Sequence, residues 1–503
     1  MNTTTTTVDP GSAVEQHSPS VWRYVRASRA HVVIDAAAYF ELMHEAMLRA
    51  RRLIFLIGWD FDSRIRLAGG RRWWNLPHRD RFPARLGAFI IWLVERTDGL
   101  QVRVLKWNFG ALKFIFRGTM IIDLARWFLH RGIDFKFDAA LPLGCSHHQK
   151  IVVIDDKMAV CGGIDMTSDR WDTPTHLHED SRRRRPNGGL YGPWHDVTMM
   201  LEGDAATALG ELGRDRWTRA GGTHMPPTAP TEESPWPERL AAEFRDVEVG
   251  IARTQARYGR FPEIREIEKL FVEQIGRARR FIYAESQYFA SRKVAEAIAL
   301  KLAEPDPPEI VLINPLTAEG WLEQAAMDGA RVRLLHAVGE RDHARRFRVF
   351  IPMTSGGASI YVHAKLMIVD DEIVRVGSAN MNNRSMGLDT EADVFIDAAR
   401  PGNAHAGAAI TLLRHKLLAE HCGVPVEEMS ELLNRYDSMI AAIGEAKSRG
   451  KRLEPFALRP LTDAEKAVAD NALLDPERPG EIFEPIGRRR GLFRVGGILR
   501  RPK

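Results

Sequence analysis

The chain has 503 residues and a formal net charge of +5, and 45% of its residues are hydrophobic. This length allows roughly two to four domains, and the balance of apolar and charged residues is that of a globular protein. The positive surplus lies at one end, because Arg488–Lys503 carries seven Lys or Arg and no acid. The rest is nearly neutral, which argues against a broad nucleic-acid-binding surface.

The cysteines and the apolar runs limit where the protein can reside. Cys145, Cys161 and Cys422 are odd in number and lack zinc-site spacing, so we expect reduced thiols. The N-terminus does not read as a Sec signal. The longest apolar run, Leu86–Val94, has nine residues, about half of the ~18–20 that a membrane span needs. We expect a soluble or peripheral protein, cytoplasmic or at the inner membrane, with export only by a non-Sec route.

Helical and extended patterns alternate along the first half. They predict a helix, a strand, a helix, a strand and a further apolar stretch over Ala36–Arg51, Leu53–Ile57, Phe82–Arg96, Val102–Trp107 and Met120–Leu129. The second half repeats the order helix, strand, helix, strand over Ile264–Arg279, Arg280–Ala284, Arg292–Ala303 and Ile310–Ile313. Gly221–Pro237, rich in Pro, Gly and Thr, is the linker candidate. Ala404–Gly423 and Pro425–Ala446 are predicted to be helical.

One stretch is written twice, as HQKIVVIDDKMAVCGGID from His148 and as HAKLMIVDDEIVRVGSAN from His363. Each copy reads His-x-Lys, four apolar residues, an Asp, and a glycine fourteen positions after the histidine. Four apolar residues between turn residues predict a buried strand, and alternate side chains of a strand share a face. The pattern therefore places His148 beside Lys150 and His363 beside Lys365, so a potential nucleophile has a neighbouring cation in each copy.

The repeat extends beyond this motif. RRLIF from Arg51 and RRFIY from Arg279 lie 228 positions apart in corresponding places, and the two motif histidines are 215 positions apart. The similar separations indicate that whole domains were duplicated.

The sequence resembles the phospholipase D superfamily, whose His-x-Lys-x4-Asp signature it carries twice. HHQKIVVID, GGIDMTSDRWDTP and PWHDV resemble the first half of the eukaryotic-type catalytic region, and YVHAKLMIVDD with VGSANMNNRSMGLDTE resembles the second. AESQYF at Ala284–Phe289 resembles the IENQYF element, with Ser286 where the family usually has Asn. The resemblance runs from about residue 30 to residue 425, and we expect no PX, PH or C2 module before it.

The resemblance implies an α/β fold of two homologous α/β/α sandwich domains in a pseudo-twofold arrangement, with the active site between them. A disordered N-terminus is expected at 1–24 and the first domain at 25–220. A linker at 221–245 and the second domain at 246–425 follow. The chain is expected to end in a helical extension with a basic tail at 426–503.

The same resemblance implies covalent catalysis through a phosphohistidine. One imidazole attacks phosphorus, and the other protonates the leaving alcohol and then activates water. We favour His148 as the nucleophile and His363 as the acid and base. Lys150 and Lys365 would bind the non-bridging oxygens, so no metal and no cofactor is expected.

Two carboxylates are candidates for orienting the imidazoles. Glu391 lies 28 residues after His363, where the superfamily places the orienting carboxylate, so we expect it to hold His363. The first-half residue at that spacing is His176, which leaves Asp172 as the candidate there.

The remaining site candidates follow from their places in the motifs. Asn380 is expected to donate to the phosphate, its counterpart Asp165 cannot do so when ionised, and Gln287 is a further phosphate contact. Asp155 and Asp370 complete the motifs at the far ends of the strands. We expect those two to hold the motif hairpins rather than touch substrate.

Several polar residues remain open to two interpretations, as site residues or as hydrogen-bonded scaffold and solvated loop. For His147, His195 and Asp196 both stay open. A solvated loop is favoured over a metal site for the stretch that contains His176, His178, Glu179 and Asp180. Arg182–Arg185 and the basic tail are either solvated or disordered, or else in contact with lipid.

We therefore predict a phospholipase D-type phosphodiesterase that releases the head group of a glycerophospholipid and leaves phosphatidic acid, with possible transfer to another alcohol. The alternatives are a cardiolipin synthase-like phosphatidyltransferase, a nucleic-acid phosphodiesterase and a catalytically silent binding protein. The expected partner is a bilayer surface in transient contact, without nucleic acid, and the chain is expected to be a monomer.

Overall fold

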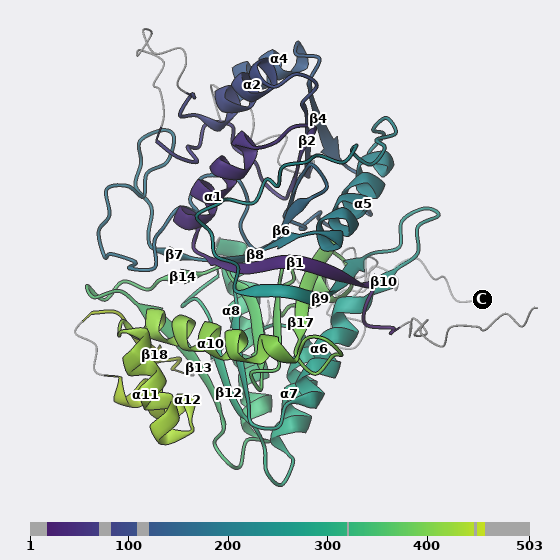
Figure 1. Cartoon of the computed structure of the whole chain (residues 1–503). Helices are drawn as coiled ribbons and strands as arrows, with labels where there is room; N and C mark the ends of the chain where they lie inside the picture. The colour runs from purple at the N-terminus through teal and green to yellow at the C-terminus, as the bar shows by residue number, and fades with distance from the viewer. Residues whose placement is uncertain (1–17, 70–81, 108–119, 319–320, 447–449, 458–503) are drawn as a thin grey trace, which may run out of the picture.

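The computed structural model describes residues 18–69, 82–107, 120–318, 321–446 and 450–457, and the side chains of 321–326 are not among them (Figure 1). The basic tail therefore lies outside the described residues. Within them, the expected disorder before residue 25 is wrong at its end, because Ser20 and Val21 are buried and the first strand begins at Arg23.

A sixteen-stranded sheet runs through the described part of both halves. From its centre outward, the first half contributes β1 (Arg23–Ile34), β8 (Val197–Glu202), β6 (Met158–Gly162), β5 (Ile151–Ile154), β2 (Leu53–Gly58), β3 (Gln101–Trp107) and β4 (Ile133–Asp138). The second half contributes β9 (Phe244–Gln255), β17 (Glu391–Asp397), β16 (Ile373–Gly377), β15 (Lys365–Val369), β11 (Phe281–Ser286), β12 (Glu309–Ile313), β13 (Phe347–Met353) and β18 (Arg452–Pro455). The two orders match strand for strand through the seventh position. The predicted α/β fold with homologous halves is confirmed.

The halves meet at the centre of this sheet, where β1 and β9 pair in antiparallel fashion over their length. Two further short strands, β7 (Trp194–His195) and β14 (Tyr361–Val362), pair in parallel outside the large sheet, and β10 (Ile264–Arg265) pairs with β9. An antiparallel pair at the centre is what an approximate twofold axis between the halves produces.

Helices cover both faces of the sheet (Figure 1). In the first half α1 (Ala36–Leu48), α2 (Leu86–Arg96) and α4 (Met120–Phe128) pack on one face, and α5 (Asp204–Arg219) packs on the other. In the second half α6 (Glu266–Arg277), α7 (Arg292–Leu302) and α8 (Trp321–Gly339) share one face with the short α9 (Asn383–Gly387). The opposite face carries α10 (Gly407–Cys422), α11 (Val426–Tyr436) and α12 (Met439–Glu445), which follow the 3-10 turn Ala404–Ala406. No helix in the described ranges has both the length and the hydropathy of a membrane span.

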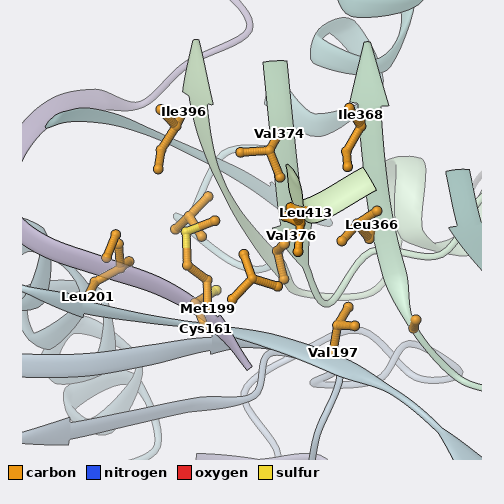
Figure 2. Packing of buried hydrophobic residues seen from close by; sticks show 14 of the residues in the cluster. Cys161, Val197, Met199, Leu201, Leu366, Ile368, Val374, Val376, Ile396 and Leu413 are labelled. Atoms are coloured by element: carbon orange, nitrogen blue, oxygen red, sulfur yellow. The ribbon is translucent and has the colours of Figure 1, made fainter. Parts of the chain in front are cut away.

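One apolar core crosses from one half to the other. Figure 2 shows Cys161 and Met199 of the first half lying against side chains of the second half, including Val376. All three are completely buried. Burial of a side chain of this size stabilises the fold by roughly 1.5–3 kcal/mol, so the contact holds the halves as one unit. All three cysteines are free and buried, as expected for reduced thiols.

Candidate active site

Each motif forms a hairpin whose far end is fixed by the motif aspartate. The Asp155 carboxylate accepts the backbone N–H groups of residues 51–53 at 2.7–2.8 Å. Asp370 accepts those of residues 279–281 at 2.6–2.8 Å. The expectation that Asp155 and Asp370 hold the hairpins is confirmed. Because side chains alternate along a strand, this anchoring fixes the direction of the histidine and the lysine at the other end.

The two motif histidines precede β5 and β15, and each is bonded to the opposite half. The His148 N–H donates to the carbonyl oxygen of Thr390 at 2.9 Å, and the His363 N–H donates to that of His195 at 2.8 Å. In each case the accepting residue directly precedes a buried carboxylate, Glu391 or Asp196. The site is therefore built across the interface between the halves.

Glu391 holds His148. Both of its carboxylate oxygens lie 3.1 Å from His148 Nδ1, and the hydroxyls of Ser378 and Ser385 donate to it at 2.5 and 2.7 Å. The prediction that Glu391 orients His363 is wrong in its partner. The carboxylate comes from the same half as His363 but reaches across the interface.

Asp196 holds His363, with its Oδ2 atom 2.7 Å from Nδ1. The assignment of an orienting role to Asp172 is wrong, because the Asp172 carboxylate binds His176 Nδ1 at 3.1 Å and the backbone N–H of Trp194 at 2.9 Å. Sequence spacing concealed Asp196, which of the residues left open here proves to be at the site.

The sheet register explains the error. Thr198 pairs with Gly162 and Asp393 pairs with Gly377, so Asp196 and Glu391 both lie two residues before the partner of the motif glycine. Asp196 follows its motif histidine by 48 residues and Glu391 follows its own by 28. An additional 20 residues in the first half break the spacing but preserve the pairing.

Both imidazoles are held at Nδ1, which leaves Nε2 for chemistry. Burial, together with the cations of Lys150 and Lys365, holds the pKa of His148 well below its usual range. Burial, Lys365 and Arg170 do the same to the pKa of His363. An imidazole that donates Nδ1–H to a carboxylate and is otherwise neutral has a lone pair on Nε2, as a nucleophile or general base requires.

The lysines converge on the same place as the histidines, since lysines of both halves act on each imidazole. Each ammonium also donates to the carbonyl oxygen of its own motif histidine, at 2.8 Å for Lys150. Burial and the neighbouring Lys150 cation lower the pKa of Lys365 to about 7. A bound phosphate anion would favour the charged form of that lysine.

The remaining candidates lie around this centre in unequal roles. Asp165 lies 3.5 Å from Lys150 Nζ and accepts the backbone N–H of Trp59, so it holds the lysine. Gln287 Oε1 lies 3.3 Å from Lys365 Nζ. Asn380 is buried, and its side-chain oxygen has no hydrogen-bond partner in the described part of the chain.

Two site features were not predicted. Arg170 is buried, lies over the Trp194 ring at 4.3 Å and contributes to the field at His363. Aromatic rings flank both histidines, with Trp59 at 6.4 Å from His148 and Trp194 at 5.3 Å from His363. Arg170 and Trp194 belong to the two peptides GGIDMTSDRWDTP and PWHDV, whose family resemblance was the available signal.

The other polar residues left open prove to be scaffold. His147 bonds to Thr390 Oγ1 at 2.7 Å and lies 2.9 Å from Asp138. The interpretation as a solvated loop holds for His178, which is exposed, but is wrong for His176, which is completely buried. Arg183 is likewise buried, although its neighbours in the arginine run are exposed.

Comparison with known proteins agrees with this geometry. The family model described as phospholipase D matches residues 46–234 and 351–440, more than half of the chain. Phospholipase D alpha 1 of Carica papaya is 25% identical over 530 residues, and that of Arabidopsis thaliana is 26% identical over 531 residues. Each alignment covers 76% of this chain and 64% of the plant protein, so the chain spans less than two thirds of these relatives.

A solved structure shares the fold. The phosphatidylserine synthase of Haemophilus influenzae Rd KW20 superposes with a TM-score of 0.52 at 11% identity, covering 82% of this chain and 95% of that one. At this identity the likeness concerns the fold alone.

Proposed function

The chain belongs to the phospholipase D family, and on that premise we propose that it is a phospholipase D-type phosphodiesterase. The substrate is a glycerophospholipid, and the products are phosphatidic acid and the free head-group alcohol. The observation that carries this proposal is the reciprocal exchange of carboxylates, Glu391 to His148 and Asp196 to His363. This exchange gives one cleft two buried imidazoles of controlled tautomer.

In the first step His148 Nε2 attacks phosphorus. The bond to the head-group oxygen breaks, and His363 in its protonated form gives its proton to that oxygen. The product is a phosphatidyl group on His148 and a neutral alcohol. Glu391 stabilises the positive charge that develops on the His148 ring, because its carboxylate faces Nδ1.

In the second step His363, now neutral, takes a proton from water as the water oxygen attacks phosphorus. The phosphorus–nitrogen bond breaks, and phosphatidic acid leaves. Lys150 and Lys365 stabilise the additional negative charge on the non-bridging oxygens in both steps. An alcohol in place of water would give transfer, so hydrolysis and transphosphatidylation differ only in the acceptor.

A bilayer surface is the proposed partner, and α4 is the region that best fits it. Ile122, Phe128 and Leu129 are 54%, 91% and 83% exposed, and Arg126 lies in the last turn of the same helix. Large apolar side chains beside a cation suit the boundary between headgroups and acyl chains. Replacing Phe128 and Leu129 by Ser should weaken binding to vesicles without slowing the cleavage of a short-chain, water-soluble phosphodiester.

Mass spectrometry of the products tests the proposed reaction. The protein is incubated with vesicles of mixed phospholipids, with and without a primary alcohol, and compared with His363→Ala and with the exposed-loop control His178→Ala. We expect phosphatidic acid from the native and control proteins, phosphatidyl alcohol when the alcohol is present, and neither from His363→Ala. Cleavage of nucleic acid but not of lipid by the folded native protein would overturn the proposal.

A further inference from the structure

A second cluster of titratable side chains lies directly behind the catalytic centre. It consists of Asp35 after β1, His176 in the loop after β6, His195 in β7 and Glu420 in α10. The first three are completely buried, and the Glu420 side chain is 6% exposed. The proposed mechanism uses none of them.

The four side chains direct one atom each towards a common point. His176 Nε2 lies 3.4 Å from Asp35 Oδ2 and 3.1 Å from Glu420 Oε1. His195 Nδ1 lies 3.3 Å from Asp35 Oδ1 and 3.0 Å from Glu420 Oε1. Donors about 2.0–2.1 Å from a tetrahedral zinc ion are about 3.3 Å apart, so these separations match the edges of a zinc tetrahedron.

The opposite nitrogen of each imidazole is held by another carboxylate. His176 Nδ1 is bonded to Asp172 at 3.1 Å, and His195 Nε2 is bonded to Glu285 at 2.8 Å. A carboxylate on the far nitrogen is the usual arrangement for a metal-bound histidine, because it fixes the tautomer and raises the basicity of the ligand.

Two of the converging atoms also lack the geometry of ordinary hydrogen bonding. Asp35 Oδ2 and His195 Nδ1 make no well-directed hydrogen bond within the described ranges, although acceptor and donor atoms lie 3.0–3.4 Å away. Both residues are completely buried, where an unpartnered polar atom is costly. A shared cation between the four atoms would remove that cost.

We propose that Asp35, His176, His195 and Glu420 bind one divalent transition-metal ion, with Zn²⁺ the best match. Two nitrogen and two oxygen donors suit zinc rather than calcium or magnesium, which prefer oxygen. The two carboxylates neutralise the ion, and four protein ligands leave no open position. The site is therefore structural.

Its position gives the ion a consequence for the active site. His195 accepts the backbone N–H of His363 through its carbonyl oxygen and is followed directly by Asp196. Glu420 brings α10 of the second half to the same point. The ion would thus fix the strand that presents the orienting carboxylate to His363, and would join the halves a second time.

A metal-free account of the same cluster exists, and it makes the proposal testable. The surrounding carboxylates, with Asp35 foremost, raise the pKa of His176 to about 8, and Glu285 with Asp35 and Glu420 raises that of His195 above its usual range. Two imidazolium ions would balance Asp35 and Glu420 without any metal. Metal content separates the two accounts directly.

The experiment uses the full chain purified without a polyhistidine tag, and the metal is measured by inductively coupled plasma mass spectrometry. We expect about one zinc ion per chain in the native protein and in His178→Ala, and a loss of zinc in His176→Ala. Reconstitution with Co²⁺ should give the visible absorption of a tetrahedral N₂O₂ site. Asp172→Asn, which keeps all four ligands, should bind zinc about 10–100-fold more weakly.

If His176→Ala fails to fold, Glu420→Gln replaces it, because the amide keeps the shape and loses the charged ligand. Native protein that is folded, contains far less than one metal ion per chain and gains no thermal stability from added Zn²⁺ would overturn the proposal and favour the paired imidazolium ions. Because metal content is read without any activity assay, this result is independent of the proposed lipid chemistry.

Discussion

The two halves build the same device with different lengths of chain. Each half supplies a histidine and a lysine from its motif hairpin, and each sends one carboxylate to the histidine of the other half. In the second half the carboxylate follows its motif closely, whereas in the first half a 20-residue insertion intervenes and carries the buried cluster with His176. The position of the carboxylate is therefore fixed by strand pairing, and the length of the connection is available for other uses.

The largest effect should come from removing either histidine. His148→Ala should prevent formation of the covalent intermediate, and His363→Ala should slow its breakdown, so each should reduce turnover by roughly 10⁴-fold or more. Rapid quench with labelled substrate measures the adduct. Label on His148 in the His363→Ala protein supports the assignment, and label on His363 in His148→Ala reverses it.

The orienting carboxylates should have the next largest effects, and they test the crossed pairing. Glu391→Gln should slow formation of the adduct on His148, and Asp196→Asn should slow the proton transfers of His363, each by about 10²–10⁴-fold in kcat. The exposed-loop change Glu179→Gln is the matched control. Pre-steady-state kinetics that place the Glu391→Gln defect in the breakdown of the adduct would contradict the pairing.

The motif aspartates should differ in their contribution to stability, although they make the same three hydrogen bonds. Asp155 is 3% exposed, whereas Asp370 is half-buried. Removing a carboxylate leaves its three N–H partners unpaired, which costs more where water cannot replace it. Asp155→Ala should lower the free energy of unfolding by about 2–4 kcal/mol and Asp370→Ala by about 1–2 kcal/mol. Urea denaturation measures both, and equal losses would contradict the argument.

The smallest expected effect separates the halves by pH. His147 occupies the place that Val362 has in the second half. Burial, with Arg216, lowers the pKa of His147 to about 4. Between about pH 6.5 and 4 the unfolded chain binds a proton that the folded chain does not, so stability present above pH 6.5 is lost as the pH falls.

This loss should amount to about 2–3 kcal/mol at full protonation. His147→Val should make the decline in unfolding free energy between pH 6.5 and 4 shallower than in the native protein, as urea midpoints across that range would measure. A native-like slope in the variant would show that other groups cause the decline.

Much of the fold could be read from the sequence, because repeated local patterns carry it. The apolar runs predicted β2, β3, β11 and β12, and the doubled motif predicted the two hairpins. The long strands β1 and β9 were missed. They are mostly paired with one another and with strands from distant segments, so their partners lie outside any local window.

The site was predicted where function and motif coincide, at the two histidines and two lysines, but not where it depends on pairing across the halves. Glu391 was identified and given the wrong histidine, because a spacing rule relates residues of one half and cannot see a contact with the other. Asp196 was left undecided because the insertion displaced it from the expected spacing. The cluster around His195 was missed because its four members are far apart in the sequence.

The antiparallel junction of β1 and β9 makes the pair of halves, and not one half, the smallest working unit. Its core passes from one half to the other (Figure 2), so opening the cleft by a hinge would expose a core rather than a surface. Substrate must enter a cleft that already has its final shape. Once both halves are encoded in a single chain, each side can change separately, as Asp165 opposite Asn380 already records. A chain cut between α5 and β9 should therefore remain active as two associated pieces, whereas each piece alone should be silent.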